Sequence, residues 1–235
     1  IYSKYSFTYG ACIGRVNEQS TWSCDTLPGF GILYYTWAGR FYLEVGMFEK
    51  LLGDKDAGLL NDAIDEACRM IVESEKMFAA ACGALLEGQD PSIDVVEKDE
   101  NIDMGERMVR RLVFQHIMMK PDQDLPSALA LVSVVHDAER IGDYNKSLLY
   151  LSKWRTDTFS QHAQVQACGH VRDMISPMFE QALKAIQEGD AEEARSVMAQ
   201  SSTVKDKTQE IQDALLQQAK GGCEDVVCSS CAQYL

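Results

Sequence analysis

The feature that most constrains the fold is a helical period that runs through most of the chain. From residue 57 onward, apolar residues recur every three or four positions, which places them on one face of an α-helix. In the segment 57–88, Gly88 follows this stripe as a helix stop. The stripe itself consists of Leu60, Ile64, Cys68, Ile71 and Met77 or Phe78. The pattern predicts an all-α fold.

Two further segments have the same period and recognisable ends. Asp90 and Pro91 predict the start of a second helix, as its N-cap and first helical residue, and Pro121 predicts its end. A third helix is predicted to begin at Asp124, with Pro126 tolerated in its first turn. Long helices joined by short turns predict an antiparallel bundle.

The pattern then restarts, which predicts an internal repeat. The stretch ALLEGQD at 84–90 is echoed by AIQEGD at 185–190, and each closes one long helix and opens the next. A helix over about 158–187, bent or interrupted by Pro177, is followed by one over 191–220 and by the start of another. We therefore predict two three-helix-bundle repeats, the second truncated at its third helix.

These boundaries divide the chain into three predicted parts. Residues 1–46 hold six of the nine tyrosines and two of the three tryptophans, without helical period. They are interpreted either as an irregular, aromatic and Gly-rich extension of unknown role or as a segment outside the natural domain. Residues 47–156 form the first predicted repeat, and residues 157–235 form the second, incomplete one.

The charge of the chain excludes one class of function. Lys plus Arg total 22 and Asp plus Glu total 36, so the net charge is −14 and the basic patch of a nucleic-acid-binding protein is absent. No segment reaches the roughly 18 uninterrupted apolar residues of a membrane span, and no secretory signal is recognised. Eight cysteines in a chain of this size favour free thiols in a reducing compartment. We therefore expect a cytoplasmic protein.

Two of the predicted helices carry acidic residues at helical spacing. The residues that share a face are Asp99, Asp103 and Glu106 on the second helix, and His136, Glu139 and Asp143 on the third. Like charges four residues apart repel by roughly a few tenths of a kcal/mol. Two facing rows would therefore favour a bound cation, and oxygen donors with one imidazole suit Mg, Mn, Ca or Fe. The alternative is a solvated face that is neutralised by Arg107, Arg110, Arg111 and Arg140.

Other candidate groups have a plainer interpretation. Cys223, Cys228 and Cys231 lie close together in the sequence, but a tetrahedral zinc site needs a fourth ligand. They are interpreted as small buried side chains, with metal or redox chemistry as the alternative. Three methionines on or beside an apolar stripe are likewise expected in the core: Met108, Met118 and Met119.

The stretches DENIDMGERMVRRL and PDQDLPSALALVSVVHDAERIGDYNKSLLYL resemble the PhoU family of phosphate-signalling regulators. That family has two three-helix repeats, each with an (E/D)xxxD motif. Asp99 and Asp103 match the motif on the second helix, and Glu139 and Asp143 match it on the third. The resemblance implies that these four residues are ligands of a metal ion or a multinuclear cluster, often of iron, on the bundle surface.

The resemblance also points to additional ligands. Glu106 and His136 flank the two motifs, with His136 as a flanking group rather than a primary ligand. Asp206 and Glu210 occupy the expected place on the second helix of the second repeat. One departure is Pro126, which stands where the family usually has Arg after Asp-Leu.

The function that the resemblance implies is that of a non-enzymatic, metal-binding regulator of phosphate uptake. Its implied partners are a Pst-type phosphate transporter ATPase and a PhoR-type sensor kinase, and the resemblance extends to a homodimer. One alternative is the PhoU-like domain of a sodium–phosphate cotransporter. Another is a di-metal carboxylate enzyme in a helical bundle, although His136-x-x-Glu139 reverses the Glu-x-x-His order of such bundles.

Overall fold

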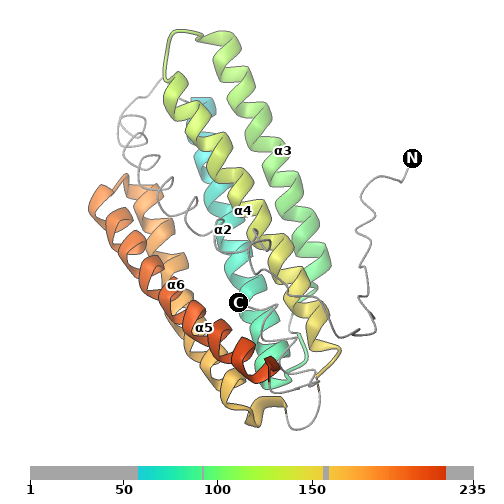
Figure 1. Cartoon of the computed structure of the whole chain (residues 1–235). Helices are drawn as coiled ribbons and strands as arrows, with labels where there is room; N and C mark the ends of the chain where they lie inside the picture. Colours follow the sequence, from blue (N-terminus) through green and yellow to red (C-terminus); the bar gives the residue numbers. More distant parts are fainter. Residues whose placement is uncertain (1–57, 92, 156–158, 221–235) are drawn as a thin grey trace, which may run out of the picture.

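The described part of the chain is built from long helices (Figure 1). The computed structural model describes residues 58–91, 93–155 and 159–220. The elements are α2 (Gly58–Cys82), a π-helix (Gly83–Glu87), α3 (Val95–Met119), α4 (Leu125–Ser152), a 3-10 turn (Phe159–Gln161), α5 (Ala163–Glu188) and α6 (Ala191–Lys220). No strand occurs within these residues, and the predicted all-α fold class is confirmed.

The helices form a bundle of three and a hairpin of two. Helices α2, α3 and α4 pack against one another, while α5 and α6 pack together and α5 lies against α2 (Figure 1). The bundle of three lies within residues 47–156, the range predicted as the first repeat, and the hairpin lies within residues 157–235, the range predicted as the second. The third helix expected for the second repeat lies outside the described residues, as do residues 1–46.

The apolar stripe predicted for α2 lies in the core. Its members Leu60, Ile64, Cys68, Ile71, Met77 and Phe78 are all buried. Each large apolar side chain that is fully buried stabilises the fold by roughly 1.5–3 kcal/mol. The Phe78 ring also lies 5.5 Å from the ring of Phe179 on α5, so the same helix holds the bundle of three to the hairpin.

Helix α3 begins later than predicted. The expected start at Asp90 and Pro91 is wrong, because the N-cap is Asp94 and the first helical residue is Val95. The Asp94 carboxylate accepts hydrogen bonds from the backbone N–H of Val96 at 3.0 Å and of Glu97 at 3.1 Å. It thereby satisfies two donors that the first helical turn would otherwise leave unpaired.

The other predicted boundaries agree more closely with the structure. Helix α3 ends before Pro121, α4 begins after Asp124, and Gly88 ends the first helical segment with φ of 74°. In the second unit, Pro177 lies inside an uninterrupted α5, so an interruption there is ruled out. Helix α5 starts at Ala163 rather than near residue 158, because a 3-10 turn precedes it.

The predicted core positions of Met108, Met118 and Met119 are wrong. Their exposed fractions are 44%, 68% and 73%. The residues of α3 that face the bundle are instead Val95, Asp99, Ile102, Gly105, Val109, Val113 and His116. This buried set follows its own helical spacing, which leaves the three methionines turned to solvent.

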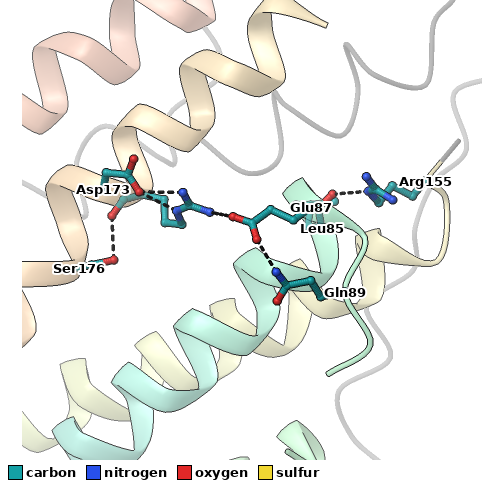
Figure 2. A network of polar contacts seen from close by, with 7 residues as sticks. Leu85, Glu87, Gln89, Arg155, Asp173 and Ser176 are labelled. Carbon is teal, nitrogen blue, oxygen red and sulfur yellow. Dashed lines mark hydrogen bonds and ion pairs between the residues drawn. The ribbon is translucent and has the colours of Figure 1, made fainter. Parts of the chain in front are cut away.

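A polar network joins the bundle of three to the hairpin (Figure 2). The Arg155 guanidinium donates to the backbone oxygen of Leu85 at 2.9 Å, and Arg172 of α5 forms an ion pair with Glu87. Gly88 leaves room for Arg155, since a Cβ at Gly88 would lie 1.9 Å from its Nη1 atom. The network therefore links the π-helix that follows α2 to Arg155 before α5 and to Arg172 within α5.

None of the described helices combines the length and the apolar character needed to cross a lipid bilayer.

Candidate metal centre

Helices α3 and α4 bring the two predicted rows of acids together. The close approach depends on Gly142 of α4, where an added Cβ would lie 3.3 Å from both Asp99 Oδ1 and Ile102 Cδ1 of α3. The two rows are in contact, since His136 Nδ1 of α4 lies 3.3 Å from Glu106 Oε1 of α3 and Lys146 of α4 forms an ion pair with Asp99 of α3. The facing arrangement expected from the helical spacing is therefore present.

The tightest group of ligand atoms consists of Glu106, His136 and Glu139. One ligand atom from each side chain lies within 4.8 Å of the others. His136 Nδ1 is 3.3 Å from Glu106 Oε1 and 3.9 Å from Glu139 Oε2. His136, expected only as a flanking group, thus lies directly between two carboxylates.

The other half of the acidic face contains a cation from the chain itself. Lys146 of α4 forms an ion pair with Asp99, and its Nζ atom is 3.0 Å from Asp143 Oδ1. Sequence reasoning did not single out Lys146, although it stands seven residues after Glu139 and three after Asp143 on the same helix face. That spacing was the signal that could have identified it.

Burial and repulsion raise the pKa of two acids of this face, Asp99 and Glu139. Burial raises the pKa of Glu139, and the neighbouring acids Asp143, Glu106 and Asp103 raise it further, against the opposing effect of His136. Burial also raises the pKa of Asp99, and the ion pair with Lys146 offsets part of this increase. A charge on either carboxylate is therefore disfavoured at this face.

The pKa of Lys146 shifts in the direction that favours its charged form. Burial by itself lowers the pKa of Lys146, but hydrogen bonds to Asp99 and Asp143 outweigh this and raise it to about 12. The ammonium group is consequently charged at any physiological pH. It neutralises Asp99 and Asp143, while Glu106 and Glu139 are left with His136 and with Arg110, whose Nη2 atom is 2.7 Å from Glu106 Oε1.

Of the four arginines that could neutralise the acidic face, two form ion pairs with described residues and two do not. Arg110 pairs with Glu106, and Arg140 lies 3.9 Å from Asp137 and donates to the hydroxyl of Tyr144 at 2.9 Å. Arg107 and Arg111 are exposed and form no ion pair with another described residue. The acidic face is therefore neutralised only in part by the arginines.

The second predicted pair of acids does not join this site. Asp206 and Glu210 lie exposed on α6, which packs against α5, and Glu210 forms an ion pair with Lys207 at 2.6 Å. The helix expected to face them lies outside the described residues, and so do Cys223, Cys228 and Cys231.

The donor set at α3 and α4 fits a metal ion. Carboxylate oxygens with one imidazole nitrogen suit Mg, Mn or Fe. The fit is best at Glu106, His136 and Glu139, where the ligand atoms already converge. Asp103 lies next to them and contributes charge, whereas Asp99 and Asp143 are held by Lys146.

The fold and the site together define a class: a helical-bundle protein with facing rows of acids on two adjacent helices. The family model of the PhoU domain matches residues 67–150, which span most of α2 and all of α3 and nearly all of α4. The resemblance seen in the sequence is therefore confirmed over that range. No match was found among curated proteins or among solved structures.

Proposed function

We propose that the chain is a metal-dependent regulator of phosphate transport that acts in the cytoplasm. Its PhoU domain would bind a hard cation between α3 and α4 and contact a Pst-type transporter ATPase and a PhoR-type sensor kinase. Two findings support this proposal: the PhoU domain match over residues 67–150, and the convergence of carboxylates from two helices at one face. The second observation carries it.

Glu106, His136 and Glu139 would hold the cation, with Asp103 adjacent. A bound cation supplies positive charge and Lewis acidity at this face. Glu106 comes from α3, and His136 and Glu139 come from α4. A cation held by all three side chains would therefore link the two helices. The repulsion that raises the pKa of Glu139 would be relieved in the same step.

Linking two helices has a consequence for partner recognition. A surface formed by α3 and α4 presents one fixed arrangement of side chains only when the helices keep one relative position. Ligation across them would favour that position over others, which would couple cation loading to the affinity for a protein partner. This coupling is the regulatory step that we propose.

The test uses the source cells with the gene for this chain deleted. Reintroduction of the unaltered chain should restore control of a phosphate-responsive reporter. The variant Glu106→Gln/His136→Gln/Glu139→Gln, expressed to the same level, should fail to do so. Full control by this variant would show that the acidic face has no part in regulation.

A matched variant separates loss of charge from loss of the site. Asp206→Asn/Glu210→Gln removes two acids from the exposed face of α6 and should leave the reporter response unchanged. Equal failure of both variants would mean that the general acidity of the chain matters and that the convergence at α3 and α4 does not.

A further inference from the structure

An exposed apolar surface lies near the turn that connects α3 to α4. In Figure 1 this end of the bundle projects away from α5 and α6. We call its four large apolar side chains the apolar tip: Phe114 and Met118 of α3, which are 63% and 68% exposed, and Leu125 and Leu129 of α4, which are 42% and 56% exposed. Large apolar side chains gathered at one exposed place indicate a contact surface for another molecule.

The contact between Glu106 and His136 shows that the apolar tip lies on one face. His136 Nδ1 is 3.3 Å from Glu106 Oε1, which sets α3 and α4 side by side at this point. Phe114 follows Glu106 by eight residues and Leu129 precedes His136 by seven, and both spacings keep a residue on the same side of its helix. At 1.5 Å per residue, the apolar tip begins about 10 Å from this contact and ends about 18 Å from it, toward the turn.

A band of arginines separates the apolar tip from the acidic face. This arginine band consists of Arg107, Arg110 and Arg111, which lie between Glu106 and Phe114 on α3. Arg107 and Arg111 are exposed and form no ion pair with another described residue, whereas Arg110 pairs with Glu106 at 2.7 Å. The matching stretch of α4, residues 125–135, contains no charged residue. The order along this face is therefore acidic, then basic, then apolar at the projecting end.

This end of the bundle differs in charge from the rest of the chain. Residues 107–135 contain four bases and two acids, whereas the whole chain carries a net charge of −14. The two acids, Asp122 and Asp124, lie in the turn, and Asp124 Oδ2 is 4.0 Å from His116 Nε2. Charges further than about 8 Å away are largely screened at physiological salt. A basic and apolar end on an acidic chain would therefore orient the chain with this end toward an anionic surface.

The dimensions of the face match the boundary layer of a lipid bilayer. The apolar tip spans about 8 Å along the helices. Amphipathic helices bound at a membrane surface bury their apolar face by about 5–10 Å. With the apolar tip at that depth, the arginine band directly behind it would lie among the lipid phosphates, which guanidinium groups bind through paired hydrogen bonds. A protein partner would need a pocket shaped to these side chains, while lipid chains adapt to them.

We infer that the apolar tip and the arginine band bind the surface of an anionic lipid bilayer. The side chains of the apolar tip enter the boundary between headgroups and acyl chains, and Arg107 and Arg111 bind lipid phosphates. Only side chains at one end of the bundle enter the bilayer. The inference does not depend on cation binding or on phosphate regulation, and its failure would leave both proposals as they stand.

The test is co-sedimentation of the full chain with lipid vesicles, compared with the same chain sedimented without lipid. Vesicles of phosphatidylcholine and phosphatidylglycerol in a three-to-one ratio should bind the chain. Vesicles of phosphatidylcholine alone should bind it about tenfold more weakly or less, because they lack the anionic lipid. Raising the salt concentration from about 0.1 to 0.5 M should also weaken binding, because it shortens the screening length.

Substitutions separate the apolar contribution from the ionic one. Phe114→Gln/Met118→Gln should weaken binding to the anionic vesicles by about tenfold or more, because less apolar surface is buried. Arg107→Gln/Arg111→Gln should weaken it by about the same factor and should reduce its dependence on salt. Asp122→Asn removes a negative charge from the turn and should strengthen binding.

Met104→Gln is the matched control. Met104 is 55% exposed on the same helix, but it lies in the acidic first half of α3, four residues after Glu100. Its substitution should leave vesicle binding unchanged. Circular dichroism checks that each variant keeps its helices, so that a loss of binding can be assigned to the face.

Several results would overturn the inference. No binding to anionic vesicles at any lipid concentration would show that the face does not contact a bilayer. Equal binding to vesicles of both compositions would exclude a role for the arginine band. Unchanged binding by both double variants would place the contact on another surface. Binding of an acidic amphipathic helical peptide in place of vesicles would assign the face to a protein partner.

Discussion

At the scale of single residues, Lys146 neutralises part of the acidic face. Its ammonium group pairs with Asp99 of α3 and lies 3.0 Å from Asp143 of α4. A cation tied to the chain thus occupies the part of the face where the PhoU resemblance implied metal ligands. We interpret Lys146 as a built-in substitute for an ion at Asp99 and Asp143, which leaves Glu106, His136 and Glu139 for a free cation.

This interpretation predicts the effect of Lys146→Met. Asp99 would keep a buried charge without its partner, so the cation-free chain should lose roughly 1 kcal/mol of stability, a modest figure because Lys146 is partly exposed. Added Mn²⁺ should restore stability in this variant more than in the unaltered chain. Thermal unfolding with and without Mn²⁺ measures both effects.

Lys207→Met is the matched control, because Lys207 pairs with Glu210 on the exposed surface of α6. Its stability should change little, and Mn²⁺ should act on it as on the unaltered chain. If Lys146→Met behaved in the same way, Lys146 would not be a substitute for an ion.

The buried thiol of Cys68 gives a second prediction at this scale. Burial, followed by the nearby charge of Asp65, raises the pKa of Cys68 to about 12. Because the folded-state pKa is raised, this thiol favours the folded state below its unfolded pKa, and that contribution is lost as pH rises toward about 12.

Alkylation measures the state of this thiol directly. At roughly pH 8, near the ordinary pKa of a free thiol, iodoacetamide should modify Cys68 in the native chain only as fast as the fold opens, and promptly in urea. Peptide mass spectrometry reports the site. Prompt native modification would contradict the burial described here.

At the scale of elements, the start of α3 depends on Asp94. Its carboxylate accepts two backbone hydrogen bonds, so Asp94→Ala should destabilise the chain by about 1 kcal/mol. Asp90→Ala removes the residue that the sequence indicated as the cap and should cost almost nothing, because Asp90 is exposed and lies before the helix. Urea unfolding of both variants measures the difference, and equal losses would refute the assignment.

Two glycines inside helices offer a matched comparison. A Cβ at Gly169 of α5 meets nothing within 4 Å, so Gly169→Ala should stabilise the chain by roughly 0.5–1 kcal/mol through helix propensity. At Gly142 of α4, a Cβ would lie 3.3 Å from Asp99 and Ile102, which should cancel that gain. Equal stabilisation by both substitutions would show that α3 and α4 are not in close contact at Gly142.

These elements also show what could be predicted from the sequence. The buried stripe of α2 and the helix stop at Gly88 were predictable, because period and glycine act locally. The start of α3 was not, since Asp90 and Asp94 are equally good caps in isolation and the connection between the helices decides between them. Met108 was misplaced because α3 has apolar residues on both faces, and only its packing against α2 and α4 distinguishes them.

The candidate site was predictable in outline and not in detail. Spacing alone placed Asp99, Asp103 and Glu106 opposite His136, Glu139 and Asp143. It could not reveal which of them converge, because that depends on the helix register set by Gly142. It also overlooked Lys146, although Lys146 stands three residues after Asp143 on the same helix face, and only the structure shows that its ammonium group pairs with Asp99.

At the scale of the whole molecule, the central claim is that the face between α3 and α4 binds a cation that stabilises the fold. A ligand that binds the folded state alone stabilises it by about 2.7 kcal/mol at a hundredfold excess over its Kd. The bundle of three provides the ligands, and the ion pair between Glu87 and Arg172 of α5 links the bundle to the hairpin. A cation at one face would therefore stabilise both units.

The measurement that tests this claim most directly is the metal content of the purified chain by elemental analysis. It would be compared with the variant Glu106→Gln/His136→Gln/Glu139→Gln, after both are loaded with Fe²⁺ or Mn²⁺ and washed. We predict stoichiometric metal in the unaltered chain and its loss in the variant. Equal and negligible metal in both would contradict the account and leave these acids as a solvated face.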